Sequence, residues 1–308
     1  IDIRPLLGGL RYCEPEAHPW SRDELLAKLK GAGGLIALLN VKVDQELLAA
    51  ASDLRVVANF AVGYDNIDVQ AASERGIIVT NTPDVLTNAT ADLAFALLLA
   101  AARRLGEGER LVREGRWQGW APGLLLGCEL SGRRLGVIGA GRIGRAVLKR
   151  AQGFDMELAY AGTRSVAEAE VLGAKRLPID ELFETCDFIS LHCPLTEETR
   201  TIVDARSLAR MKKTAILVNT ARGGCVDSDA LAEALESQSI AGAGLDVFED
   251  EPQVPKRLLA CQRAVLAPHI GSATFGARSQ MAEICAEAVR LVLAGECPPT
   301  AINPEVMG

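Results

Sequence analysis

The sequence has little of several features that would point to other classes of protein. Aromatic residues make up 4% of its 308 residues, and only three residues are histidine. The eight cysteines form no C-x-x-C pair and show no metal-ligand spacing, which favours reduced, mostly buried thiols over disulfides or a metal site. A net charge of −7 argues against a surface that binds nucleic acid or an anionic membrane.

Long apolar runs are also missing. The longest uncharged apolar run, from Leu93 to Ala102, is far too short to span a bilayer, and no signal peptide is visible. We therefore expect a cytoplasmic protein without a membrane or nucleic-acid partner. Because the whole molecule is acidic, an anionic substrate has to be captured by local cationic side chains.

Short apolar runs alternate with helical patterns along the whole chain. This alternation is typical of an α/β fold, in which helices connect the strands of a parallel sheet. The length allows two domains of ordinary size. The runs with strand character are Leu35–Leu39, Arg55–Asn59, Ile77–Thr80, Arg134–Gly139, Glu157–Ala161, Phe188–Leu191, Ala215–Asn219, Ala241–Asp246 and Ala264–Ala267.

Two long apolar helices, from Thr90 to about Arg104 and from Phe275 to Leu293, flank the second series of strands. They predict an inner domain over 90–274, inserted into an outer domain built from 1–89 and 275–308. Residues 106–130 are rich in glycine, contain Trp117 and Trp120, and are expected to be irregular.

A strand followed by G-x-G-x-x-G and a helix begins at Arg134. The three glycines are Gly139, Gly141 and Gly144. Such a turn lets a pyrophosphate approach the N-terminus of the following helix, and here the strand and helix supply the required context. The sequence therefore predicts a dinucleotide-binding turn.

Three later stretches place chemically useful residues just after strand-like runs: Arg222, the acidic run Glu249-Asp250-Glu251, and His269. Reduction of a 2-oxo acid needs a cation for the carboxylate, an acid that protonates the new alkoxide, and a charge partner that keeps this acid protonated. Spacing alone does not choose among the three acids.

Each of these candidates has a simpler interpretation. Arg222 would also suit an exposed loop, and His269 would suit a packed strand end. His192 is the competing candidate for the acid, whereas His18 lies in a polar loop beside a proline and is expected at the surface.

The turn after the second inner strand bears on the cofactor. NAD-specific proteins of this kind place an acid there to bind the ribose 2′-hydroxyl. Here the turn reads Gly162-Thr163-Arg164-Ser165, and no acid occurs between Glu157 and Glu168. Arg164 and the two hydroxyls would suit a 2′-phosphate, so NADP is preferred over NAD. The alternative is a solvated loop arginine and a site indifferent between the two cofactors.

Taken together, these stretches resemble the D-isomer-specific 2-hydroxyacid dehydrogenase family over essentially the whole chain. The inner-domain similarity lies in GAGRIG at 139–144, DFISLHCPLTEET at 187–199, MKKTAILVNTARGG at 211–224, AGAGLDVFEDEP at 241–252 and APHIGSAT at 267–274. In the outer domain, ANFAVGYDNID at 58–68 and TNTPDVLTNATADLAFALLL at 80–99 look most like the glyoxylate and hydroxypyruvate reductase branch. The resemblance implies two doubly wound parallel-sheet domains, a Rossmann dinucleotide-binding domain inserted into a smaller flavodoxin-like substrate domain.

The resemblance also implies residue roles. It gives catalysis to Arg222, Glu251 and His269, which selects Glu251 from the acidic run. It gives substrate binding to Arg222 and to the backbone N–H groups of Val62 and Gly63. The residues that it places at the cofactor are Gly139, Gly141, Arg142, Ile143, Gly144, Gly162, Thr163, Arg164, Pro194, Thr220, Ala221, Asp246, His269 and Gly271.

Family members are commonly dimers through the segment that corresponds to 106–130, so the resemblance implies a homodimer. A tryptophan of this arm can reach the partner's substrate pocket in the reductase branch, and Trp120 is the better-placed candidate. Alternatively, Trp120 only fills the dimer interface.

The expected activity is hydride transfer from NADPH or NADH to a small 2-oxo acid, glyoxylate first and hydroxypyruvate second. Glu251, where formate dehydrogenases of the superfamily have Gln, argues against formate. A phosphoglycerate dehydrogenase ranks third, because no regulatory domain follows Pro304. A dinucleotide-sensing corepressor of the same fold is the non-enzymatic alternative. Ile1 to Arg4 are too short and polar to supply the family's opening strand, so we expect that strand to lie outside this sequence.

Overall fold

The computed structural model describes residues 1–15 and 18–307 and divides the chain into two compact units. The first unit is discontinuous and comprises Ile1–Leu86 and Ala273–Gly308, while the second comprises Thr87–Ser272. The border expected at residue 90 falls inside a helix, because α4 already begins at Thr87.

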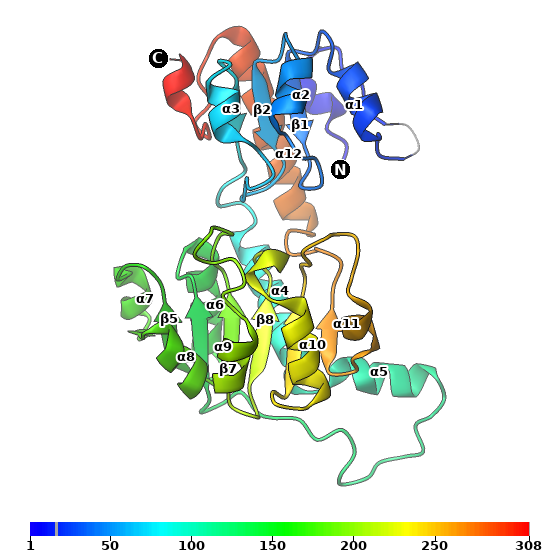
Figure 1. Ribbon diagram of the computed structural model, residues 1–308, viewed down its shortest axis with the longest axis vertical. Helices are drawn as coiled ribbons and strands as arrows, with labels where there is room; N and C mark the ends of the chain where they lie inside the picture. Colours follow the sequence, from blue (N-terminus) through cyan, green and yellow to red (C-terminus); the bar gives the residue numbers. More distant parts are fainter. Residues whose placement is uncertain (16–17, 308) are drawn as a thin grey trace. The chain divides into compact units, whose positions relative to one another are not determined.

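The first unit has a parallel sheet of three strands in the order β1-β2-β3. Its elements are η1 (Arg4–Leu7), α1 (Arg22–Lys28), β1 (Gly34–Ala37), α2 (Gln45–Ala50), β2 (Val56–Asn59), α3 (Val69–Ser73), β3 (Ile78–Thr80), α12 (Phe275–Ala294) and η3 (Pro304–Met307). Side chains alternate across the strands. Val57 and Val79 pack with α1, α2 and α3, whereas Val56 and Ile78 pack against α12. Helices therefore cover both faces of the sheet (Figure 1).

The second unit has a parallel sheet of seven strands in the order β10-β9-β8-β7-β4-β5-β6. Its elements are α4 (Thr87–Ala102), α5 (Leu105–Arg113), β4 (Arg134–Ile138), α6 (Arg142–Gln152), β5 (Glu157–Ala161), α7 (Ala167–Val171), β6 (Lys175–Arg176), α8 (Ile179–Thr185), β7 (Phe188–Leu191), α9 (Ala205–Arg210), β8 (Ile216–Asn219), η2 (Gly223–Cys225), α10 (Ser228–Glu236), β9 (Gly242–Leu245), α11 (Lys256–Ala260) and β10 (Ala264–Leu266). The first strand, β4, pairs with both β5 and β7. The strand order therefore reverses beside β4, which is where ligands bind in open α/β sheets.

Two apolar cores cover the faces of this sheet. Val137, Tyr160 and Val218 pack with α4 and α6 on one face. Ile189 and Leu217 pack with α8, α9 and α10 on the other (Figure 1). The predicted fold class, with parallel sheets and a Rossmann domain, is confirmed.

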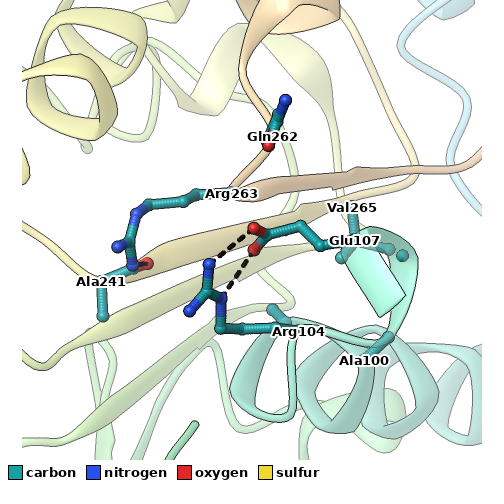
Figure 2. Close-up of a pocket in the computed structure, with 9 residues that line it drawn as sticks. Ala100, Arg104, Glu107, Ala241, Gln262, Arg263 and Val265 are labelled. Atoms are coloured by element: carbon teal, nitrogen blue, oxygen red, sulfur yellow. Dashed lines mark hydrogen bonds and ion pairs between the residues drawn. The ribbon is translucent and has the colours of Figure 1, made fainter. Parts of the chain in front are cut away.

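The expectation that residues 106–130 are irregular was wrong for their first part, because α5 spans Leu105–Arg113. Gly106 and Gly108 lower the helix propensity and hide the helix from a pattern-based prediction. The Arg104 guanidinium donates to both carboxylate oxygens of Glu107, at 2.9 and 2.7 Å. Figure 2 shows this pair beside Arg263. A charged pair three residues apart at its start therefore supports α5.

In the part of the chain that the structure describes, no helix is both long and apolar enough to cross a membrane. The same residues contain no group of three or more His, Cys, Asp or Glu side chains that could hold a metal ion.

Candidate active site

The glycine turn after β4 lies at the point where the strand order reverses. Gly139 has φ +93°, and a Cβ atom there would lie 2.7 to 2.8 Å from backbone atoms of His192 and Cys193, which follow β7. Only glycine fits this close approach. At Gly141, the N-cap of α6, a Cβ would meet nothing within 4 Å. The turn is therefore tightly packed on its strand side and open at the helix N-terminus, as a pyrophosphate site requires.

Other residues predicted at the cofactor fit the same interpretation. Arg142, Ile143 and Gly144 form the first turn of α6. Pro194, in the loop after β7, is exposed. Thr220 follows β8, and its Oγ1 atom is buried without a hydrogen-bond partner in the described residues. A buried hydroxyl without a partner is a site where a ligand can supply the missing hydrogen bond.

His269 and Glu251 form a hydrogen-bonded pair. The distance from His269 Nδ1 to Glu251 Oε2 is 2.7 Å, and the two side chains are 28% and 33% exposed. The other carboxylate oxygen accepts the Phe248 N–H at 2.9 Å. Burial by itself raises the pKa of Glu251, but the hydrogen bonds from His269 and Phe248 outweigh it and hold that pKa below its ordinary value. Glu251 is therefore an ionised acceptor, His269 Nδ1 carries the hydrogen, and Nε2 takes no part in this pair.

The loop that carries His269 is fixed by a buried carboxylate. Asp246, at the end of β9, is 1% exposed. Its two oxygens accept the N–H groups of Ile270 and Gly271, each at 2.7 Å. The His269 N–H donates to the Asp246 carbonyl at 2.9 Å, and His269 itself has φ +53°. Three hydrogen bonds to one residue thus hold the histidine in a left-handed conformation that non-glycine residues rarely adopt.

Burial raises the pKa of Asp246, and the two backbone N–H groups offset that effect only in part. The resemblance gives Asp246 a role at the cofactor, and this role stays a prediction. The hydrogen bonds show that Asp246 holds the loop of His269 in position.

Arg222 lies on a loop that is shaped by the strand before it. Asn219, the last residue of β8, donates from Nδ2 to the Arg222 carbonyl at 2.8 Å and accepts the Ala221 N–H at 3.0 Å. A Cβ atom on Gly223 would come within 2.0 to 2.3 Å of backbone atoms of Phe248 and Glu249. The Arg222 loop therefore packs directly against the loop of Glu251. Its guanidinium also contributes to the lowered pKa of Glu251.

His192 has a different environment. Its Nε2 atom lies 2.7 Å from the Ser190 hydroxyl, and burial lowers its pKa to about 3. A histidine with so low a pKa is neutral near pH 7, and a neutral imidazole is a poor proton donor. The geometry therefore favours His269 over His192 as the acid.

The turn after β5 is exposed and is held by side chains. Gly162, Thr163 and Arg164 are all exposed, and the Arg164 guanidinium has no partner within the described part of the chain. The Ser165 hydroxyl donates to the carboxylate of Glu170, which also accepts the Tyr160 hydroxyl at 2.9 Å. The Ser165 hydroxyl thus already donates within the protein, and its predicted contact with a 2′-phosphate stays a prediction.

In the first unit, Val62 and Gly63 lie on the loop that follows β2. Their carbonyls accept hydrogen bonds from the side-chain amides of Asn81 and Asn59, at 2.8 and 2.7 Å. Their N–H groups donate to no acceptor among the residues that the structure describes. Two neighbouring free N–H groups are suited to binding an anion.

Comparison with known proteins identifies the family. Residues 95–271 match the D-isomer specific 2-hydroxyacid dehydrogenase, NAD binding domain. The chain is 51% identical over 291 residues to the glyoxylate reductase of Pyrococcus furiosus, which covers 93% of this chain and 87% of that protein.

The chain belongs to the D-isomer specific 2-hydroxyacid dehydrogenase family.

Solved structures agree with this assignment. A glyoxylate reductase from Paecilomyes thermophila has a TM-score of 0.83 and 36% identity, and the match covers 92% of this chain and 89% of that one. An NADPH-dependent glyoxylate/hydroxypyruvate reductase from Sinorhizobium meliloti, in complex with NADP and malonate, has a TM-score of 0.82 and 38% identity, with coverage of 90% and 86%. The resemblance drawn from the sequence is confirmed.

This dehydrogenase therefore uses a nicotinamide dinucleotide. The open position at Gly141 and the unpartnered hydroxyl of Thr220 fit such a group at the carboxyl end of the sheet. Arg142 and Ile143, in the first turn of α6, and Ala221, beside Arg222, lie at the same end.

The second unit of the dehydrogenase brings most of the predicted residues to one edge of its sheet. Arg222, Glu251 and His269 meet through adjacent loops, and the glycine turn lies at the same edge. Trp120 lies apart in the segment after α5 and is 84% exposed. Nothing within the described second unit covers it.

Several residues of the dehydrogenase escaped the sequence analysis. Asn59 and Asn81 hold the Val62–Gly63 loop of the first unit through their side-chain amides, and Asn219 holds the Arg222 loop of the second. An asparagine directly after a buried strand is the signal that could have found them. Arg176, on the edge strand β6, contacts the turn after β5, and no sequence pattern indicates it.

Proposed function

We propose that this dehydrogenase reduces glyoxylate, and hydroxypyruvate second, with NADPH preferred over NADH. The observation that carries the proposal is the His269–Glu251 pair beside the Arg222 loop, which supplies an acid, its charge partner and a cation at one edge of the sheet. The printed functions of the Pyrococcus, Paecilomyes and Sinorhizobium relatives support the substrate class.

Each side chain has one task in this proposal. Arg222 binds the substrate carboxylate, because a guanidinium presents parallel N–H donors to two carboxylate oxygens. The free N–H groups of Val62 and Gly63 support the substrate-binding role that the resemblance gives them. A bound reduced nicotinamide supplies the hydride.

His269 supplies the proton. With Nδ1 hydrogen-bonded to Glu251, protonated His269 presents Nε2–H to the alkoxide that forms. After the proton leaves, His269 is still held in place by Glu251 and by the Asp246 loop. The same arrangement works in reverse for oxidation of the hydroxy acid, with His269 as the base.

The preference for NADPH rests on Arg164. The turn from Gly162 to Ser165 contains no acidic residue, and the Arg164 guanidinium is exposed. A charge-assisted contact to a 2′-phosphate contributes about 1.5–3 kcal/mol, or roughly tenfold or more in preference. The Sinorhizobium relative, described as NADPH-dependent, supports this assignment. The test is kcat/KM with both cofactors in the parent and in Arg164→Ala, where we expect the preference for NADPH to fall.

A panel of 2-oxo acids tests the substrate. We expect glyoxylate and hydroxypyruvate to give the highest kcat/KM, and pyruvate, 2-oxoisocaproate and phenylpyruvate to follow. A preference for the branched or aromatic acid would contradict the proposal. The Arg222→Lys variant is the matched control, because it keeps the charge and loses the paired donors, and should raise KM for every acid in the panel.

We also propose a homodimer through the segment 106–130. Leu105, Val112, Trp117, Trp120 and Leu126 are all exposed there, and exposed apolar side chains concentrated in one segment favour an interaction surface. Most soluble homo-oligomers are dimers with two-fold symmetry, so a second copy of this chain is the expected partner. A monomer in light scattering at micromolar concentration would refute this assembly. A Trp120→Ala variant that stays dimeric and active would assign Trp120 to the interface rim and not to the substrate.

A further inference from the structure

Arg176 contacts the exposed turn that follows β5. It is the second residue of the edge strand β6 and pairs with Tyr160 of β5. Its Nη2 atom donates to the carbonyls of Gly162 and Thr163, at 3.0 and 3.2 Å. One guanidinium nitrogen thus bridges two consecutive carbonyls of the turn that carries Arg164.

The charges around this turn do not favour an anion without Arg176. Carbonyl oxygens repel a phosphate, and Arg176 offsets this repulsion at two of them by donating hydrogen bonds. The exposed carboxylate of Glu170 lies at the same turn, where it accepts hydrogen bonds from Ser165 and Tyr160. These hydrogen bonds, with the nearby charge of Arg176, lower the pKa of Glu170, so it is ionised near pH 7. Arg164 and Arg176 together outweigh this single negative charge.

We propose that Arg176 is a positioning residue for the ribose 2′-phosphate of NADP: it holds the turn at Gly162 and Thr163 and adds a second positive charge beside Arg164. The inference rests on the NADPH preference proposed above and extends it to a residue on a different strand.

The physical reason lies in preorganisation. Glycine at 162 leaves the turn free to sample many conformations, and an exposed turn has no core packing to restrict them. Two hydrogen bonds from one planar group select a single arrangement before the cofactor binds, which lowers the entropic cost of binding. Removing Arg176 would free both carbonyls and leave Arg164 opposed by Glu170.

The test is calorimetric titration with two nucleotides that differ only by the 2′-phosphate, adenosine 2′,5′-bisphosphate and adenosine 5′-monophosphate. We expect Arg176→Ala to weaken binding of the bisphosphate about tenfold and to change binding of the monophosphate less than about twofold. Arg176→Lys keeps the charge but not the bridge between the two carbonyls, and should weaken binding of the bisphosphate about threefold.

Lys175→Ala is the matched control. It removes an exposed positive charge from the adjacent position of the same strand, whose side chain points to the opposite face. It should bind both nucleotides as the parent does.

Steady-state kinetics supply the second measurement. In Arg176→Ala, KM for NADPH should rise by a similar factor with kcat unchanged, while KM for NADH stays near the parent value. Equal weakening of both nucleotides, or an unchanged bisphosphate affinity, would overturn the role of Arg176. A parent that binds both nucleotides equally would overturn it together with the NADPH preference, and glyoxylate turnover with NADH would still show whether the reductase assignment stands.

Discussion

Two carboxylates at the same edge of the seven-stranded sheet hold neighbouring loops in different ways. Asp246 is 1% exposed and accepts two backbone N–H groups from the loop of His269. Glu170 is exposed and accepts the side-chain hydroxyls of Tyr160 and Ser165 at the turn after β5. Burial raises the pKa of Asp246, whereas hydrogen bonds from Ser165 and Tyr160 lower that of Glu170.

In the proposed function, this difference separates the loops that carry out the chemistry from the turn that selects the cofactor. Backbone N–H groups are present whatever the side chains are, so a buried carboxylate that binds them fixes a loop in one geometry. A turn held by side chains, most of them exposed, depends on each of those side chains and can be altered by single substitutions. We expect changes near His269 to cost activity with both cofactors, and changes near Glu170 to alter only the choice between them.

The largest effect is expected for His269→Ala. Loss of the acid should lower kcat by about 10²- to 10⁴-fold with either cofactor, because general acid catalysis typically contributes that much. The matched variant is His192→Ala, which removes a neutral histidine bonded to Ser190 and should keep kcat within about threefold of the parent. Full turnover in His269→Ala, with loss in His192→Ala, would reverse the assignment.

Asp246→Asn should have the next largest effect. An amide keeps one acceptor oxygen and replaces the other by a donor, so one of the Ile270 and Gly271 N–H groups is left without its partner. An unsatisfied buried N–H costs about 1–3 kcal/mol, which chemical denaturation would measure. We also expect a lower kcat with unchanged cofactor preference, because the loop of His269 shifts. Wild-type stability and kcat in this variant would show that the carboxylate is not needed to hold the loop.

Glu251→Gln should act mainly through pH. Glutamine keeps an acceptor for His269 Nδ1 but removes the ionised carboxylate, so the pH-dependent stability that Glu251 contributes, measured by chemical denaturation at several pH values, should disappear. The folded-state pKa of Glu251 lies below its ordinary value of 4.5. The parent therefore gains stability from this group above about pH 4.5 and loses it as the pH falls through the lower folded value, whereas the glutamine variant lacks that pH-dependent contribution. Superimposable stability profiles for parent and variant would contradict the pairing.

The smallest effect is expected for Glu170→Gln. Removal of the negative charge beside Arg164 and Arg176 should raise the preference for NADPH by about twofold, and the increase should shrink at high salt because the groups are exposed. kcat with either cofactor should not change. The measurement is the ratio of the two kcat/KM values at low and high ionic strength, and a loss of kcat would mean that this turn and the catalytic loops are not as separate as the comparison suggests.

Much of the fold could be predicted from local sequence. The strands Glu157–Ala161 and Phe188–Leu191 have the predicted bounds, because buried parallel strands are short apolar runs between turns. The short edge strand β6 and the helix α5 could not be predicted in the same way. Lys175–Arg176 has no apolar signal, and α5 depends on the Arg104–Glu107 pair more than on the propensities of its glycines.

Contiguous residues were enough to locate the glycine turn and to show that Arg222, Glu251 and His269 follow strands. Spacing alone could not choose among the acids at 249–251, and the family resemblance selected Glu251. The structure shows that its carboxylate is the one that contacts His269. Three features became visible only in the folded protein: Asp246 holds the histidine loop, burial keeps His192 neutral, and Arg176 contacts the turn of Arg164. All three depend on the order of the strands in the sheet and on the groups that surround a side chain. The residues next to that side chain in the sequence encode neither the strand order nor the surroundings.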